Sequence, residues 1–110
     1  MKGGAEMPIQ EIEELKRSFV SQLDPISIYL FGSYAVGDFN EDSDFDFYIV
    51  VDDDSTDLAS LTSQAYRSIR HIKRRPVDII VGSQSSFNTR KTIPSVENEV
   101  YNKGILLYGD

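Results

Sequence analysis

Hydrophobic residues recur along this chain at the two spacings that helices and strands require. Apolar positions at three- and four-residue steps predict amphipathic helices over residues 9–23 and 58–72. β-branched and aromatic runs predict four strands, over residues 26–31, 44–51, 77–81 and 105–108. In the second of these runs aspartates alternate with apolar residues, so that one face of the predicted strand is acidic and the other hydrophobic.

Turn-forming residues separate the predicted elements. Asp24 and Pro25 end the first helix, and Pro76 ends the second because proline cannot continue a helical hydrogen-bond ladder. Shorter helices are predicted over 33–37 and 94–103, whereas the polar connector 83–92 has no clear pattern. We find no internal repeat, low-complexity tract or domain boundary, and therefore expect one domain over residues 1–110.

Composition narrows the classes of protein that this chain can represent. The net charge of -7 and pI near 4.6 argue against stable nucleic-acid binding by the chain alone, because a broad basic face is missing. The absence of cysteine excludes a disulfide scaffold and a thiolate metal site. No segment approaches the roughly 18 consecutive apolar residues of a membrane span. These features are typical of a soluble cytoplasmic protein.

Three aspartates interrupt the predicted strands. Asp44 and Asp46 are two residues apart, so in a strand they project from the same face at about 7 Å from each other. Asp78 interrupts another strand, and neighbouring strands could bring all three carboxylates together. A solvated acidic face is the alternative explanation for a lone pair of this kind. Three converging hard oxygen ligands would instead suit Mg²⁺.

A glycine–serine pair precedes the aspartates at the end of the first predicted strand. Gly32 allows close approach to the backbone, and the Ser33 hydroxyl could donate a hydrogen bond to a phosphate oxygen. A turn glycine followed by a helix-capping serine is an equally simple interpretation of the two residues alone. Their spacing matters more, because ten residues separate Ser33 from Asp44 and a return strand would place the two sites side by side.

The combined pattern, Gly32-Ser33-x(10)-Asp44-x-Asp46, resembles the polymerase-beta-type nucleotidyltransferase superfamily, and within it the minimal nucleotidyltransferases. The resemblance implies an α+β fold with a mixed sheet of three or four strands, helices on one face and the carboxylates on the other. It implies that Asp44, Asp46 and Asp78 are the metal-binding and catalytic carboxylates, with two Mg²⁺ ions present when nucleotide is bound. It further implies that Gly32 and Ser33 bind the phosphates of the donor, expected to be ATP.

One segment departs from the family pattern. Many members carry an arginine in the short helix after the glycine–serine pair, but here the segment Tyr34-Ala35-Val36 has no basic residue. The missing charge could come from the basic cluster over residues 67–75 or from a partner. The alternative is that this cluster is a solvated helix end, matched to the negative pole of the helix dipole.

The function expected from the resemblance is Mg²⁺-dependent transfer of a nucleoside monophosphate, AMP from ATP, to an acceptor hydroxyl. Larger members carry a helical acceptor-binding domain, so here a second chain is expected to hold the acceptor. Minimal members are often paired with a helical HEPN-type protein in toxin–antitoxin systems, which makes such a partner the favoured acceptor. The alternatives are a catalytically weak binding module that neutralises or scaffolds a partner protein, and nucleotidylation of a small molecule.

Overall fold

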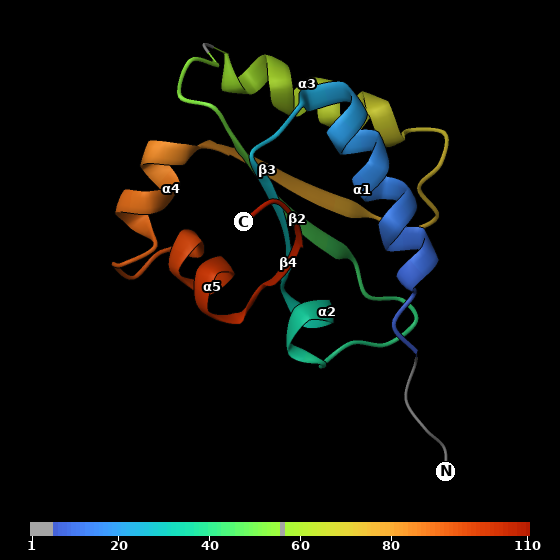
Figure 1. Cartoon of the computed structure of the whole chain (residues 1–110). Helices are drawn as coiled ribbons and strands as arrows, with labels where there is room; N and C mark the ends of the chain where they lie inside the picture. Colours follow the sequence, from blue (N-terminus) through green and yellow to red (C-terminus); the bar gives the residue numbers. More distant parts are fainter. Residues whose placement is uncertain (1–5, 56) are drawn as a thin grey trace.

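Four strands form the central sheet of the protein in the order β3-β2-β1-β4 (Figure 1). The computed structural model describes residues 6–55 and 57–110 of the 110-residue chain. β1 runs antiparallel to β2 and β4, whereas β2 runs parallel to β3, so the sheet is mixed as expected. The strands are β1 (Ser27–Phe31), β2 (Phe45–Val51), β3 (Val77–Ser83) and β4 (Ile105–Tyr108).

Where the structure describes the chain, five helices pack around this sheet. They are α1 (Ile9–Leu23), α2 (Ser33–Val36), α3 (Leu58–Ile69), α4 (Gln84–Arg90) and α5 (Val96–Lys103). Helix α4 occupies the connector whose structure the pattern left open; its single buried apolar residue, Phe87, is too weak a periodic signal to predict a helix. The Ser83 hydroxyl caps α4 by accepting a hydrogen bond from the Ser86 amide. Within the described part of the chain, no helix has the length and apolar character needed to cross a membrane.

Helices α1 and α3 pack on one face of the sheet and form the larger core. Alternate residues of β2 point into this core because successive side chains of a strand face opposite sides. Phe47 of β2 meets Phe19 of α1 edge-on, with ring centroids 5.2 Å apart. The core residues that α1, α3 and β2 contribute are Ile12, Leu15, Phe19, Leu23, Phe45, Phe47, Ile49, Val51, Ala65 and Ile69.

Helices α4 and α5 pack against the opposite face, which corrects the expectation of helices on one face only. Tyr48 and Val50 of β2 point to this second face and are buried against Phe87 of α4 and Val100 of α5. The physical reason is that β2 is apolar on both faces beyond Asp46. An apolar surface on each side of the sheet needs its own cover.

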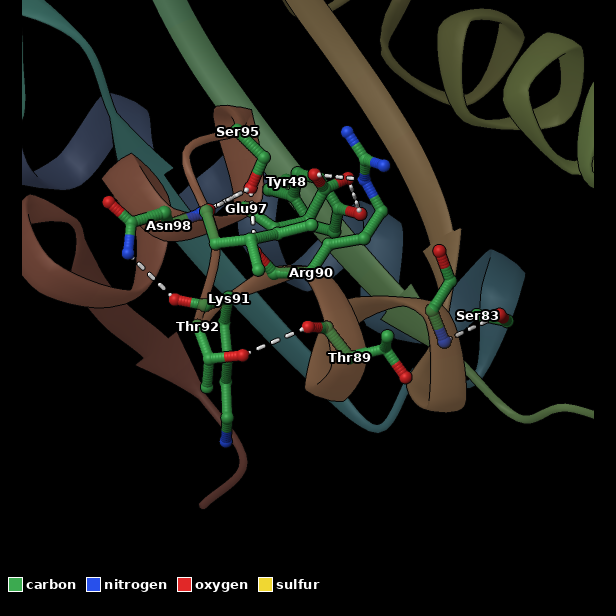
Figure 2. A network of polar contacts seen from close by, with 11 residues as sticks. Tyr48, Ser83, Thr89, Arg90, Lys91, Thr92, Ser95, Glu97 and Asn98 are labelled. Carbon is green, nitrogen blue, oxygen red and sulfur yellow. Dashed lines mark hydrogen bonds and ion pairs between the residues drawn. The ribbon is translucent and has the colours of Figure 1, made fainter.

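A polar network joins α4 and α5 to the sheet (Figure 2). The Tyr48 hydroxyl donates to Glu97 Oε2 at 2.8 Å, and Arg90 Nε donates to Glu97 Oε1 at 2.9 Å. A side-chain amide of α5 strengthens the connection, because Asn98 Nδ2 donates to the Lys91 carbonyl at 2.8 Å. Both oxygens of the buried Glu97 carboxylate are therefore hydrogen-bonded, as a buried carboxylate requires.

Candidate active site

Two of the three sequence-predicted aspartates are direct neighbours across parallel strands. Asp46 of β2 and Asp78 of β3 are partners in the register, flanked by the pairs Phe45 with Val77 and Phe47 with Ile79. Strand alternation places both carboxylates on the sheet face opposite the larger core. Asp46 is partly buried, whereas Asp78 is exposed to solvent.

Burial and the crowding of acidic groups raise the proton affinity of Asp46. Its pKa is raised to about 6, first because burial disfavours the charged form and then because of the negative charges of Asp78 and Asp44. A hydrogen bond with the Asp78 side chain and the charge of Glu99 act in the same direction. Among the described residues, the side chains around Asp46 therefore leave its negative charge uncompensated.

The third aspartate, Asp44, is the residue immediately before β2, and its side chain is exposed. Asp44, Asp46 and Asp78 line one open pocket of about 620 Å³ together with Ser33. Four of the five residues that the sequence predicted for the site thus share one pocket. The pocket is completed by residues of the loop before β2, namely Asn40, Asp42 and Ser43.

The fifth predicted residue, Gly32, lies directly against Asp46. Its φ of +75° is a left-handed backbone conformation that residues with side chains rarely adopt. A Cβ atom at this position would collide with the Asp46 carboxylate, chiefly with Oδ2. Glycine is therefore required here both by the turn between β1 and α2 and by the room that the Asp46 carboxylate needs.

The loop between α2 and β2 is organised by Tyr34, which is 1% exposed. The Tyr34 hydroxyl donates to the Asn40 carbonyl at 3.1 Å, and its ring stacks on Phe39 with centroids 4.4 Å apart. Asn40 in turn accepts a hydrogen bond from the Asp42 amide through Oδ1 at 2.7 Å. The sequence pattern did not single out Asn40 or Asp42 as pocket residues; their turn-forming side chains were the only signal.

The carboxylate oxygens of Asp44, Asp46 and Asp78 are the kind of ligand that a hard divalent cation prefers. Among residues 6–55 and 57–110, no three or more acidic, histidine or cysteine side chains are arranged so that they could hold a metal ion. Mg²⁺ commonly takes only one or two protein carboxylates, with phosphate oxygens and water as its other ligands. Asp46, with its raised pKa, and the neighbouring Asp44 and Asp78 fit that partial role, because a cation would relieve their mutual repulsion.

Comparison with known families identifies the kind of domain to which this site belongs. Residues 12–107 match the nucleotidyltransferase domain family. The chain belongs to this family. The resemblance inferred from the glycine–serine and aspartate pattern is thereby confirmed, and the protein is a nucleotidyltransferase. No curated protein matches the sequence.

Solved structures share the fold of this nucleotidyltransferase at low sequence identity. A Sulfolobus solfataricus protein proposed to be a nucleotidyltransferase aligns with a TM-score of 0.60 and 19% identity, over 99% of this chain and 93% of that chain. A toxin–antitoxin structure with AMP-PNP gives 0.53 and 22%, over 94% and 74%. A mutant of the toxin–antitoxin MntA–HpeT gives 0.54 and 21%, over 96% and 75%. These likenesses confirm the α+β nucleotidyltransferase fold.

Proposed function

We propose that this nucleotidyltransferase moves AMP from ATP to an acceptor hydroxyl, with Mg²⁺ held at the aspartate cluster. The observation that carries the proposal is the in-register pair of Asp46 and Asp78, which lines one pocket with Asp44 and Ser33. In the reaction the acceptor oxygen bonds to the α-phosphorus, and the bond from that phosphorus to the leaving pyrophosphate breaks. Carboxylates arranged around an open pocket leave room for the acceptor oxygen to approach the phosphorus in line with the departing pyrophosphate oxygen.

Each site residue has a proposed role that follows from its position. Asp44 and Asp46 would hold the metal, with two ions present when nucleotide is bound; Mg²⁺ neutralises phosphate charge and lowers the pKa of an attacking hydroxyl. Asp78 is exposed beside Asp46, and we assign it the role of accepting the proton of the incoming hydroxyl.

The glycine–serine turn is the proposed binding site for the β- and γ-phosphates. Ser33 lines the aspartate pocket, where its hydroxyl can donate to a phosphate oxygen. Gly32, which has no side chain, leaves the backbone accessible beside Asp46. The turn and the carboxylates would therefore bind opposite ends of the same triphosphate.

We propose that the acceptor hydroxyl belongs to a partner protein, a helical HEPN-type protein of a toxin–antitoxin pair. The openness of the pocket supports this, because Asp44 and Asp78 are both exposed and could be reached by a side chain of another protein. The net charge of -7 suits association with a basic partner. Two solved structures that share the fold are toxin–antitoxin structures.

A binding module without turnover is the second candidate function. It is favoured by the segment Tyr34-Ala35-Val36, which places no basic residue beside Ser33 to stabilise the charge of a triphosphate. Such a protein would neutralise its partner by contact alone. The two candidates predict the same complex but different masses of the partner.

The decisive experiment is co-expression with the product of the neighbouring gene, followed by addition of ATP and Mg²⁺ and intact-mass measurement. The mass of the partner is expected to increase by one AMP with the wild-type chain and to stay unchanged with Asp46→Asn. A stable complex whose masses do not change would support the binding module. If no complex forms, the proposed partner is wrong.

Metal and donor binding can be tested without any partner. The melting temperature of the wild-type chain is expected to rise with Mn²⁺ and AMP-PNP together, because both bind only to the folded protein. The double variant Asp44→Ala/Asp46→Ala should lose this rise. Equal shifts in the two proteins would place the nucleotide elsewhere and refute the proposed site.

A further inference from the structure

Arg75 makes a two-pronged ion pair with Glu11 across the molecule. Its Nε donates to Glu11 Oε2 and its Nη2 to Glu11 Oε1, both at 3.0 Å. The Arg75 side chain is 18% exposed and that of Glu11 is 9% exposed, so the pair is largely screened from water. Two parallel hydrogen bonds between partly buried charged groups form one of the stronger and more directional contacts available to side chains.

The third nitrogen of the guanidinium group points toward the loop that carries the site. Arg75 Nη1 donates to the Tyr34 hydroxyl and makes a longer contact of 3.5 Å with the Ser43 carbonyl. The guanidinium carbon also lies 4.5 Å from the ring centroid of Phe45 and 5.4 Å from that of Tyr34. One side chain thus links α1, α2, the loop before β2 and the first residue of β2.

Each residue that Arg75 contacts on this side is adjacent in sequence to a residue of the pocket. Tyr34 follows Ser33, and Phe45 lies between Asp44 and Asp46. Arg75 itself does not line the pocket, and its charge is neutralised by Glu11. Arg75 therefore does not supply the basic group that the short helix α2 lacks.

We infer that Arg75 is a positioning residue of the active site, which holds the Ser33 turn and Asp44 in register with Asp46 and Asp78. The effect on catalysis rests on the proposed function, whereas the effect on the loop does not. Lysine cannot replace Arg75, because its single ammonium group cannot make the two parallel bonds to Glu11 and reach the Tyr34 hydroxyl at the same time. Tyr34 is the main connection to the loop, since it also donates to the Asn40 carbonyl.

Hydrogen–deuterium exchange of the Arg75→Met variant tests the positioning role directly. Amides of residues 38–44 are expected to exchange about tenfold faster than in the wild type, because local opening of the loop becomes easier. Amides of α4 and α5 should keep their wild-type rates. Unchanged exchange over 38–44, or equal acceleration throughout the chain, would overturn the inference.

The Arg90→Met variant is a matched control, because Arg90 also pairs with a glutamate but joins α4 to α5. Within residues 6–55 and 57–110, its ion pair is with Glu97 and not with a residue of the loop. The variant should leave exchange over 38–44 unchanged. If it accelerates that loop as much as Arg75→Met does, the effect is general destabilisation and the inference fails. Arg75→Lys serves as a second variant should Arg75→Met not fold, and it should show the same loop-specific acceleration.

Binding of Mn²⁺ with AMP-PNP, measured by calorimetry well below the melting temperature, links the loop to the site. Arg75→Met is expected to lose about tenfold in affinity, because a displaced Ser33 turn and Asp44 no longer meet one ligand together. Wild-type affinity in a variant with a mobile loop would overturn the positioning role. If the wild type itself does not bind, the proposed function fails, and the exchange result still decides whether Arg75 holds the loop.

Discussion

Two carboxylate regions lie on the same face of the sheet and differ in how their charge is balanced. Asp46 and Tyr48 are two residues apart on β2 and point the same way. Asp46 faces acidic neighbours, and its pKa is raised to about 6, with burial as the largest cause. Glu97, which bonds to Tyr48, has a lowered pKa: burial raises it, but the Tyr48 and Arg90 hydrogen bonds outweigh burial.

The contrast is in line with a structural role for Glu97 and with the ligand-binding role that we propose for Asp46. Around Glu97 the hydrogen bonds are complete, so the network stabilises the fold without any ligand. Around Asp46 the charge remains unbalanced, which costs stability unless a cation binds. A cation bound in this open pocket would balance that charge, as the proposed function requires.

The largest expected effect comes from removing the Asp46 charge. Asp46→Asn should lower nucleotidyl transfer at least about a hundredfold, because a carboxylate oxygen that we propose to bind the metal is lost. The metal-free protein should nevertheless melt at a higher temperature, since one of several repelling carboxylates is gone. Circular dichroism melts and transfer assays on the same preparation measure both. A lower melting temperature would show that the carboxylate is structural, like Glu97.

Removal of the Glu97 carboxylate should have the opposite effects: stability should fall while transfer is kept. Glu97→Ala is expected to lower the free energy of unfolding by about 2 kcal/mol, because the buried Tyr48 hydroxyl loses its charged acceptor. Transfer by the protein that remains folded should stay at the wild-type rate. Urea unfolding followed by fluorescence or circular dichroism gives the first quantity. Wild-type stability would show that the network adds nothing to the fold.

The sequence pattern predicted the functional region better than the structural one. Asp44, Asp46 and Gly32 belong to a short segment whose spacing carries the motif, and strand alternation alone predicts the common direction of the two aspartates. The pairing of Asp46 with Asp78 depends on the register between β2 and β3. Hydrophobic spacing does not give that register, and the resemblance implied only that Asp78 belongs to the same carboxylate set. The sheet, α1 and the general position of α5 also follow from hydrophobic spacing.

What the pattern missed depends on contacts between distant residues. Tyr48 and Glu97 are 49 residues apart, and Arg75 and Glu11 are 64 apart, so neither pair has a local signal. The second layer of helices was missed because α4 has only one buried apolar residue, Phe87. The end of α3 at Ile69, before the predicted residue 72, reflects the turn that leads to Pro76.

Each region also contains a glycine packed against its central side chain, Gly32 beside Asp46 and Gly82 beside Tyr48. A Cβ at Gly82 would collide with the Tyr48 hydroxyl, so Gly82→Ala should lower the free energy of unfolding by about 1–2 kcal/mol. Gly32→Ala should also destabilise, because its φ is positive, but it alone should abolish the thermal shift given by Mn²⁺ and AMP-PNP. Loss of that shift in Gly82→Ala would mean that the two regions are coupled.

The smallest expected effect is the contribution of Glu97 to the pH dependence of the free energy of unfolding. Because its folded pKa lies below the ordinary value of 4.5, its contribution is present above that value and is lost as the pH falls through the folded pKa. Tyr48 and Arg90 are the groups that face it in this network. Arg90 is 49% exposed, so water weakens the pair, and we expect a contribution below about 1 kcal/mol.

Comparison of the wild type with Glu97→Gln isolates this contribution. Every other carboxylate, Asp46 included, is common to both proteins, so the slope that they produce cancels in the difference. Urea unfolding between about pH 3 and 6 should show the wild type more stable at the upper end and the two proteins converging at the lower end. A difference that is constant with pH would mean that Glu97 has the same pKa in the folded and unfolded chain. In that case the Tyr48 hydroxyl and Arg90 would only offset the cost of burying the carboxylate.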